Sequence, residues 1–197
     1  FVTFFCRYWR HLTSVGHFSC LFRPHLWLDK GLFGKGYCCA PQEALDGNAP
    51  MDPAEYERMY NLEETYWWFQ GRKHIVAGML RRLPLAHRAN GKVLDMGCGT
   101  GLMLEHLAKQ YWAVGLDFSA LALIFTRCRG ICRLIRADVE SLPILSEALD
   151  LVTALDLAEH VDRDDLLLEG IYRALKPGGY LILTAPAYPF LWSDHDE

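Results

Sequence analysis

Short runs of hydrophobic residues alternate with stretches of helical spacing between residues 91 and 184. The runs predict buried strands that end near Leu94 or cover residues 112–116, 131–136, 149–155 and 180–184. Between them, residues 102–110, 118–128 and 164–175 have the spacing of amphipathic helices. Strands that alternate with helices form a mostly parallel sheet with helices on both faces. The pattern therefore predicts a doubly wound α/β fold.

A glycine-rich run, K-V-L-D-M-G-C-G-T-G at residues 92–101, joins the first predicted strand to the first predicted helix. Gly97, Gly99 and Gly101 remove side chains where the backbone turns sharply and where a ligand can come close. The N–H groups at the start of the helix have no partners within it, so they favour a polar or anionic group above the strand end. This unit predicts a nucleotide-type cofactor site.

Acidic residues follow the next two strands, at the edge where the carboxyl ends of the strands meet. A carboxylate at Asp117 can accept hydrogen bonds from both hydroxyls of a ribose. Asp138, together with the backbone of Val139, can bind the edge of an adenine ring. A dinucleotide site would have the spacing G-x-G-x-x-G, but Leu102 occupies the place of the third glycine. The residues therefore favour an adenosine-containing cofactor over a nicotinamide dinucleotide.

The segment 56–83 has a helical pattern and is dense in aromatic residues, with Y-W-W-F at 66–69. We interpret most of these aromatics as packing residues that seat short helices on the edge of the domain. The alternative is a lid over cofactor and substrate, with Arg72 near a carboxylate. Asp52 is a plausible N-cap for the first helix, with Pro53 at its first position.

Residues 1–50 differ in composition from the rest of the chain. They carry five Lys/Arg and three Asp/Glu, a net charge of +2, whereas residues 51–197 carry fifteen and twenty-one, a net charge of −6. They show no sustained period and end in the turn-rich D-G-N-A-P. Their cysteines and histidines are possible zinc ligands, but the spacings form no two close ligand pairs. We interpret residues 1–50 as a poorly ordered extension, read in frame upstream of a native start at Met51.

The charge and cysteine content exclude several classes of protein. A net charge of −4 gives no reason to expect a nucleic-acid partner, and no stretch approaches the roughly 18 apolar residues of a membrane span. Arg7, Arg10 and His11 interrupt the aromatic start of the chain, so we reject a secretion signal. Seven cysteines, an odd number, then favour reduced thiols and a cytoplasmic location.

Five motifs in order resemble those of the class I S-adenosylmethionine-dependent methyltransferases, in the small-molecule group called type 11 or type 12. They are V-L-D-M-G-C-G-T-G at 93–101, G-L-D-F-S at 115–119, A-D-V-E-S-L-P at 137–143, L-D-L-V-T-A-L-D-L-A-E-H-V at 149–161 and A-L-K-P-G-G-Y-L-I-L-T-A-P at 174–186. The resemblance covers residues 51–197. It implies a Rossmann-like fold, S-adenosylmethionine as cofactor and methyl transfer to an oxygen, nitrogen or carbon nucleophile of a small molecule. The alternatives are a non-catalytic cofactor-binding protein and, more weakly, a nicotinamide-dependent oxidoreductase.

The resemblance also assigns cofactor-binding positions. These are Asp95, Gly97, Gly99, Asp117, Phe118, Asp138, Val139 and Leu155. We add Cys98 and Gly101 of the glycine loop, and Arg72 of the lid alternative, to the candidate cofactor-binding residues. Asp95 would act on the amino group of the methionine part and Asp117 on the ribose, while Phe118 would lie against the adenine face. The backbone near Leu155 would close the methionine side, and Cys98 would be a small filler without a redox role.

Methyl transfer from a sulfonium is an in-line displacement, so the enzyme mainly aligns the nucleophile and keeps water out. A hydroxyl nucleophile also needs a base or a metal, and His160 is the candidate base, although a local backbone contact explains it equally well. We expect no metal ion. The minor alternative is that Asp156, Glu159 and His160 hold a divalent ion, because they resemble the acid-x-x-Glu-His pattern of ubiquinone-pathway O-methyltransferases with a shortened first ligand.

The resemblance further implies a seven-stranded sheet in the order 3-2-1-4-5-7-6. After the fifth predicted strand only residues 185–197 remain, too few for two more strands. We therefore expect a domain over 51–197 that is incomplete at its C-terminal end, with an exposed edge on the strand at 180–184. The sequence does not indicate the oligomeric state or the acceptor.

Overall fold

The computed structural model describes residues 4–5, 53–87 and 91–186. Its strands are β1 (Phe4–Phe5), β2 (Lys92–Met96), β3 (Trp112–Asp117), β4 (Leu134–Arg136), β5 (Leu149–Leu155) and β6 (Leu175–Thr184). Its α-helices are α1 (Pro53–Leu62), α2 (Trp67–Leu80), α3 (Leu102–Ala108), α4 (Ala120–Cys128) and α5 (Asp164–Ala174). Short 3-10 turns are η2 (Pro84–His87), η3 (Val139–Ser141) and η4 (Ala158–His160).

The strands form one sheet in the order β1-β6-β5-β2-β3-β4, in which only β1 is antiparallel to its neighbour. Strand β2 lies in the middle of the parallel part and pairs with β3 on one side and β5 on the other. The chain leaves β2 in one direction along the sheet and later returns on its other side. A ligand crevice forms at such a switch point, outside the carboxyl ends of the strands. The predicted fold and the order of its five parallel strands are confirmed.

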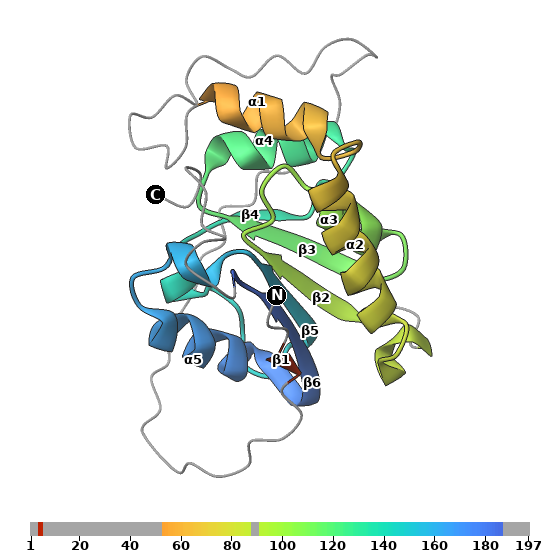
Figure 1. Cartoon of the computed structure of the whole chain (residues 1–197). Helices are drawn as coiled ribbons and strands as arrows, with labels where there is room; N and C mark the ends of the chain where they lie inside the picture. Colours follow the sequence, from red (N-terminus) through yellow and green to blue (C-terminus); the bar gives the residue numbers. More distant parts are fainter. Residues whose placement is uncertain (1–3, 6–52, 88–90, 187–197) are drawn as a thin grey trace.

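The two faces of the sheet bury different side chains because successive residues of a strand point to opposite sides. Val93 and Leu151 pack with residues of α2 and α3 in one cluster. Leu94 and Val152 pack with residues of α5 in another. Figure 1 shows α2 and α3 on one side of the sheet and α5 on the other, with α1 lying along α4. Strands buried on both faces explain the continuous apolar runs of the sequence.

Two predicted boundaries are wrong. Strand β4 begins at Leu134, three residues after the predicted Ile131, because residues 131–133 contribute one backbone hydrogen bond, from Gly115 to the Arg133 carbonyl, before the ladder begins. Strand β6 begins at Leu175, five residues before the predicted start. It includes the turn-rich K-P-G-G because Gly178 adopts a φ of 78° and the register shifts opposite β5.

The edge of β6 has a partner at Ile182 and Leu183, which pair antiparallel with Phe5 and Phe4. The predicted exposed edge is therefore wrong at these two positions, because two residues of the N-terminal segment supply the missing ladder bonds. The rest of residues 1–52, including the expected cap Asp52, lies outside the described residues, so the interpretation of residues 1–50 stays a prediction. Within the described ranges, no helix is long and apolar enough to cross a membrane.

Candidate functional site

The glycine loop between β2 and α3 lies at the carboxyl edge of the sheet. Gly97, Gly99 and Gly101 have φ values of 64°, 53° and 90°, a conformation that other residues rarely adopt. A Cβ atom at Gly101 would lie 2.8 Å from the Thr126 side chain, and one at Gly97 would lie 2.8 Å from the Leu157 side chain. The loop therefore requires glycine both for its backbone and for its close approach to neighbouring segments.

Asp95, near the end of β2, is buried, with 3% of its surface exposed. The Thr153 hydroxyl donates a hydrogen bond to its Oδ1 over 2.5 Å. Burial raises the pKa of Asp95 to about 7, while the Thr153 hydrogen bond and the Arg72 charge oppose the rise and the Asp117 charge adds to it. Asp95 is therefore poised to change its charge near neutral pH.

Asp117, at the end of β3, is held by two backbone N–H groups. Gly99 N donates to its Oδ2 over 2.8 Å, and Ser119 N donates to its Oδ1 over 2.9 Å. Burial raises the pKa of this carboxyl, and hydrogen bonds from Ser119, Gly99 and Phe118 oppose that rise. Each carboxylate oxygen has a second lone pair, so Asp117 can still accept a hydrogen bond from a ligand hydroxyl.

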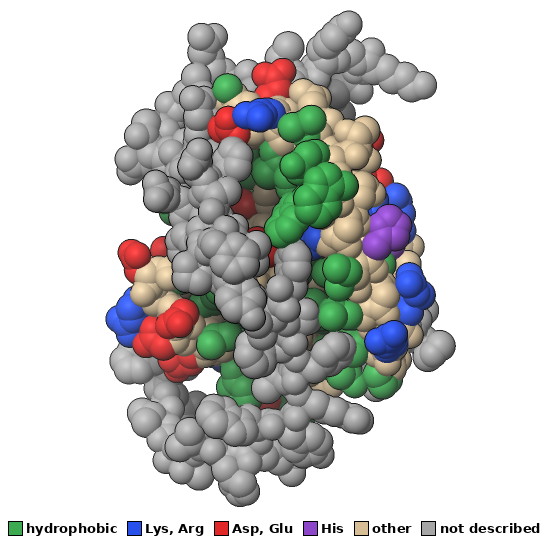
Figure 2. All heavy atoms as spheres, viewed as in Figure 1, with side chains coloured by type: hydrophobic (Ala, Val, Ile, Leu, Met, Phe, Trp, Pro, Cys, Tyr) green, Lys and Arg blue, Asp and Glu red, His purple; other side chains and the backbone are tan. Residues whose placement is uncertain are grey.

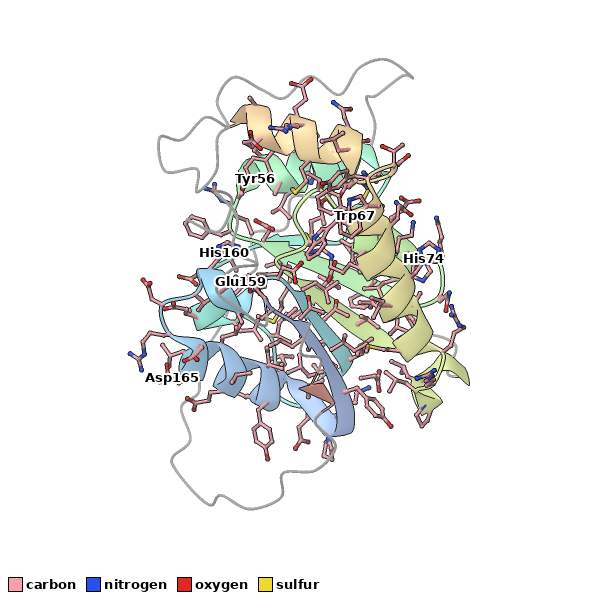
Figure 3. The ribbon with its side chains drawn as sticks, in the orientation of Figure 1. Tyr56, Trp67, His74, Glu159, His160 and Asp165 are labelled. Carbon is pink, nitrogen blue, oxygen red and sulfur yellow. The ribbon has the colours of Figure 1, made fainter. Side chains whose placement is uncertain are left out.

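Tyr56 of α1 is a neighbour of this carboxylate that the sequence interpretation did not single out (Figure 3). The side chain is buried and packs with Leu121 and Ala122 of α4. Burial raises the pKa of its hydroxyl, a hydrogen bond with Ser119 opposes that rise and the Asp117 charge adds to it. Helix α1 therefore contributes a side chain to the edge of the site.

The predicted adenine-binding residues lie beside Asp117, because Asp117 is paired with Arg136 in the β3–β4 register. Phe118 is half exposed, so one face of its ring is available to a ligand. Asp138 is exposed, and its Oδ1 accepts a hydrogen bond from Glu140 N over 2.9 Å as the cap of η3. Val139 is partly buried against the core. The structure thus brings these residues together and also gives Asp138 a local capping role.

Arg72 of α2 forms an ion pair with Asp156, the residue after β5. The Thr184 hydroxyl donates to Asp156 Oδ1 over 2.7 Å, and Asp156 N donates to the Thr184 carbonyl over 2.9 Å. Asp156 has a φ of 51°, and the Arg72 guanidinium lies 5.6 Å from the centroid of the Phe69 ring. The sequence interpretation placed Arg72 near a carboxylate under the lid, as a cofactor-binding residue, and this stays a prediction. Within the structure, Arg72 pairs with Asp156.

The segment after β5 carries the proposed base. His160 is exposed, and its backbone N donates to the Leu157 carbonyl over 3.0 Å, while both carboxylate oxygens of Glu159 are buried. Figure 3 places these two residues across the sheet edge from α2. In the described part of the chain, no three histidine, cysteine or acidic side chains are grouped as metal ligands. Asp156 instead contacts Arg72 and Thr184.

The aromatic segment at 66–69 is only partly buried. Trp67 is 69% exposed and Tyr66 is 48% exposed, so the packing interpretation is wrong for these two rings. Figure 2 shows hydrophobic side chains gathered over α2, beside basic and histidine side chains. Trp67, labelled in Figure 3, is the first residue of α2, and Arg72 lies five positions later in the same helix. The lid interpretation therefore keeps a structural basis in these exposed rings.

A buried ion pair below the α1–α2 connection was missed by the sequence interpretation. Arg129, which follows α4, has 3% of its side chain exposed and pairs with Glu63, of which 5% is exposed. Glu63 also accepts a hydrogen bond from the Thr100 hydroxyl of the glycine loop over 2.6 Å. No local pattern marks these residues, because the partners lie in three separate segments. The one signal in the sequence was that the acid Glu63 lies within an aromatic stretch.

Comparisons with known proteins agree with this geometry. Residues 94–183 match the family described as "Methyltransferase domain". The ubiquinone biosynthesis O-methyltransferase of Aliivibrio fischeri (strain MJ11) is 28% identical over 147 residues, which cover 68% of this chain and 63% of that protein. The chain therefore spans less than two thirds of the length of this curated relative.

Solved structures show the same fold. A protein from Methanococcus maripaludis has a TM-score of 0.60 and 22% identity, covering 68% of this chain and 64% of that chain. A Thermotoga maritima protein, described as a SAM-dependent methyltransferase and possible histamine N-methyltransferase, has a TM-score of 0.53 and 27% identity. That match covers 66% of this chain and 56% of that chain.

Proposed function

We propose that this chain, a class I methyltransferase by the domain at its residues 94–183, transfers a methyl group from S-adenosylmethionine to a small-molecule acceptor. One observation supports the proposal above all. Asp95, Asp117 and Asp138 lie at the carboxyl ends of three neighbouring strands, around a loop whose positive φ values favour glycine. This arrangement offers separate partners for an amino group, a ribose and an adenine edge.

The residues fit the adenosine part of this cofactor. The Asp117 carboxylate, which accepts from the Gly99 and Ser119 N–H groups, would also accept hydrogen bonds from the ribose hydroxyls. The exposed ring of Phe118 would cover the adenine, whose amino group Asp138 would bind beside the Val139 backbone. Asp138 would bind with the carboxylate oxygen that does not cap η3.

The residues also fit the methionine part. Ionised Asp95 would bind the ammonium group, and Arg72 would lie near the methionine carboxylate. The backbones of Gly97, Gly99 and Leu155 would close around the methionine part of the cofactor. Cys98 is buried and its thiol Sγ lies within 2.9 Å of where a Cβ at Gly115 would be, so it fills space inside the loop. Burial raises the pKa of the Cys98 thiol, which keeps it neutral.

The bound cofactor supplies a methyl group on a sulfonium, which is activated towards nucleophiles. The chain would contribute alignment of the acceptor with that group and exclusion of water. For a hydroxyl acceptor, His160 would take the proton at one ring nitrogen and pass it to solvent, to which the side chain is exposed. For an amine acceptor in its neutral form, no base is needed before transfer. The arrangement of Arg72 and Asp156 supports catalysis without a divalent ion.

Calorimetry on the whole chain tests the proposal directly. We expect S-adenosylmethionine and S-adenosylhomocysteine to bind, and NAD to leave the heat unchanged. Binding of NAD in place of both would overturn the cofactor assignment. Methyl release on a panel of metabolites then separates an enzyme from the alternative, a non-catalytic protein with the same fold. A cytoplasmic location, and a native start at Met51, are further parts of the proposal that rest on the sequence alone.

A further inference from the structure

The glycine loop is held from outside by side chains of three other segments. Gly99 N donates to Asp117, as described above, and the Gly99 carbonyl accepts a hydrogen bond from the Thr126 hydroxyl over 2.7 Å. The next carbonyl, that of Thr100, accepts from Arg129 Nε over 2.8 Å. The three peptide groups around Gly99 and Thr100 are thus fixed by side chains from β3, α4 and the residue after α4.

Glu63 adds a fourth anchor, from the connection between α1 and α2. Its Oε1 accepts from the Thr100 hydroxyl over 2.6 Å and from Arg129 Nη2 over 2.5 Å. Thr100 is 1% exposed, and the Tyr60 ring covers Arg129 with a centroid distance of 4.5 Å. The Thr100 residue therefore bonds to Arg129 through its backbone and to Glu63 through its side chain, away from water.

This contact lies one peptide from the proposed ribose site. Thr100 is covalently joined to Gly99, and the Gly99 N–H is bonded to the carboxylate of Asp117. A movement of Thr100 would turn that N–H and change the position of the Asp117 carboxylate. The α1–α2 connection is thus linked to the ribose position through four residues, Glu63, Thr100, Gly99 and Asp117.

Glu64 provides an internal comparison. It follows Glu63 in sequence and also pairs with Arg129, over 2.9 Å through Nη1, but 65% of its side chain is exposed. An exposed pair contributes little because water screens both charges. Within the part of the chain that the structure describes, Glu64 makes no hydrogen bond or ion pair with the glycine loop, whereas Glu63 binds Thr100 directly.

We propose that Glu63 and Arg129 are positioning residues for the glycine loop, which tie the α1–α2 connection to the loop and hold Gly99 and Asp117 in their cofactor-binding arrangement. This inference rests on the proposed function. The two N-terminal helices lie outside the five motifs and outside the matched residues 94–183. The inference gives these helices a role in cofactor affinity. Removal of the pair should weaken cofactor binding even where the protein remains folded.

A pair of variants separates positioning from folding. Losing one partner of a buried ion pair leaves the other charge buried without its partner, which is strongly destabilising, whereas replacing both by apolar side chains of similar size is often neutral. We therefore compare Arg129→Met with the double variant Glu63→Met/Arg129→Met. If the residues act only on stability, the double variant regains both its melting temperature and its affinity. If they position the loop, it regains the melting temperature alone.

The experiment is calorimetry with S-adenosylhomocysteine and thermal unfolding, both on the whole chain. We expect the double variant to bind about tenfold more weakly than the wild type at a melting temperature above that of Arg129→Met. Glu64→Gln, the matched control, should bind within about twofold of the wild type. Thr100→Val tests the same contact from the loop side and should weaken binding severalfold, since it removes only the hydroxyl.

The outcomes are distinguishable. A wild-type chain that does not bind S-adenosylhomocysteine would overturn the proposed function and this inference with it. A wild type that binds, with a folded double variant and Thr100→Val of unchanged affinity, would overturn the inference and leave the proposed function standing. If the double variant does not fold, the affinities of Thr100→Val and Glu63→Gln test the inference instead. Thr100→Val keeps both charges of the ion pair, and Glu63→Gln keeps an acceptor for the Thr100 hydroxyl.

Discussion

Arg72 of α2 and Asp156 of the segment after β5 form an ion pair although they lie 84 positions apart in the sequence. Each side chain is 20% exposed, and Asp156 also accepts the hydroxyl hydrogen of Thr184. Helix α2 is thereby fastened to the carboxyl ends of β5 and β6. The left-handed backbone of Asp156 costs conformational energy, which these two contacts offset.

Breaking this ion pair should destabilise the protein and weaken cofactor binding. In Arg72→Met, Asp156 keeps only Thr184 as partner, and we expect a loss of roughly 1–3 kcal/mol in the free energy of unfolding. Chemical denaturation measures this loss, and calorimetry measures the accompanying fall in affinity. The control is Arg82→Met, which changes an exposed arginine just beyond the same helix. Equal stability of the two variants would show that the ion pair contributes nothing.

Replacing the proposed ribose ligand should act on binding more than on stability. Asp117→Ala removes the partner of any ribose hydroxyl, together with the acceptor for Gly99 N. We expect a loss on the order of 1.5–3 kcal/mol, or tenfold or more in affinity for S-adenosylhomocysteine. Asp165→Ala, at an exposed acid of α5 shown in Figure 3, should bind as the wild type does. Unchanged binding by Asp117→Ala in calorimetry would sink the ribose assignment.

The raised pKa of Asp95 predicts a pH dependence of stability without ligand. Its folded pKa is about 7, against an ordinary value of 3.8 for an aspartate side chain, so the folded state binds the proton more tightly. The stability that the protonated side chain contributes is present at low pH and is lost as the pH rises towards about 7. Asp95→Asn keeps an acceptor for Thr153 and should remove this dependence. Denaturation curves at pH 5, 6, 7 and 8 on both proteins test it.

The same group predicts the opposite trend for binding of a ligand with an ammonium group. Only ionised Asp95 attracts that cation, so affinity should increase as the pH rises through about 7. Thr153, Arg72 and Asp117 are the groups that act on Asp95, and none of the three is changed in Asp95→Asn. Calorimetry of the variant should therefore show a flatter pH profile. A profile as steep as that of the wild type would assign the dependence to another group.

Two glycines with similar backbones separate strain from steric conflict. Gly101 and Gly130 have φ values of 90° and 82°, but a Cβ at Gly101 would lie 2.8 Å from Thr126, whereas one at Gly130 meets nothing within 4 Å. Gly130→Ala should cost about 1 kcal/mol from backbone strain alone. Gly101→Ala should cost more and should also weaken cofactor binding. If denaturation shows equal losses in the free energy of unfolding for the two variants, the result would show that Thr126 moves aside freely.

A chain that begins at Met51 should bind the cofactor as the whole chain does. The proposed ligands lie on α2 and on β2 to β5 with the loops that follow these strands, while the described strand β1 pairs with Ile182 and Leu183 of β6. Without β1, the β6 edge at these residues has free N–H and C=O groups, which favours pairing with another chain. Size-exclusion chromatography should therefore show more self-association. A shortened chain that stays monomeric but loses affinity would assign residues 1–50 to the cofactor site.

The sequence predicted what local patterns encode. Strand β5 was predicted to the residue, because its largely apolar run is buried on both faces and is followed by Asp156. The acids Asp95 and Asp117 were placed at strand ends because parallel strands share one carboxyl edge. The contact of Asp117 with Gly99 could not be predicted, since it depends on how far the loop folds back over β3.

Contacts between distant segments could not be predicted either, because they too depend on how separate parts of the chain pack together. The pairs of Arg129 with Glu63 and of Arg72 with Asp156 join separate segments whose relative placement no period of the sequence specifies. Phe4 and Phe5 lie in a stretch without an alternating pattern, so nothing marked them as a strand. A strand of two residues takes its conformation from the edge that it joins.

The central position of β2 also has a consequence for the order in which the chain folds. Lys92 of β2 pairs with Trp112, 20 positions away, whereas Val93 pairs with Leu151, 58 positions away. Closing the longer loop costs more chain entropy, by about 0.6 kcal/mol for each doubling of length. We expect β2, α3 and β3 to assemble first, because their contacts are the more local ones. The ribose position at Asp117 would then exist before the strand that leads to Asp156 has docked.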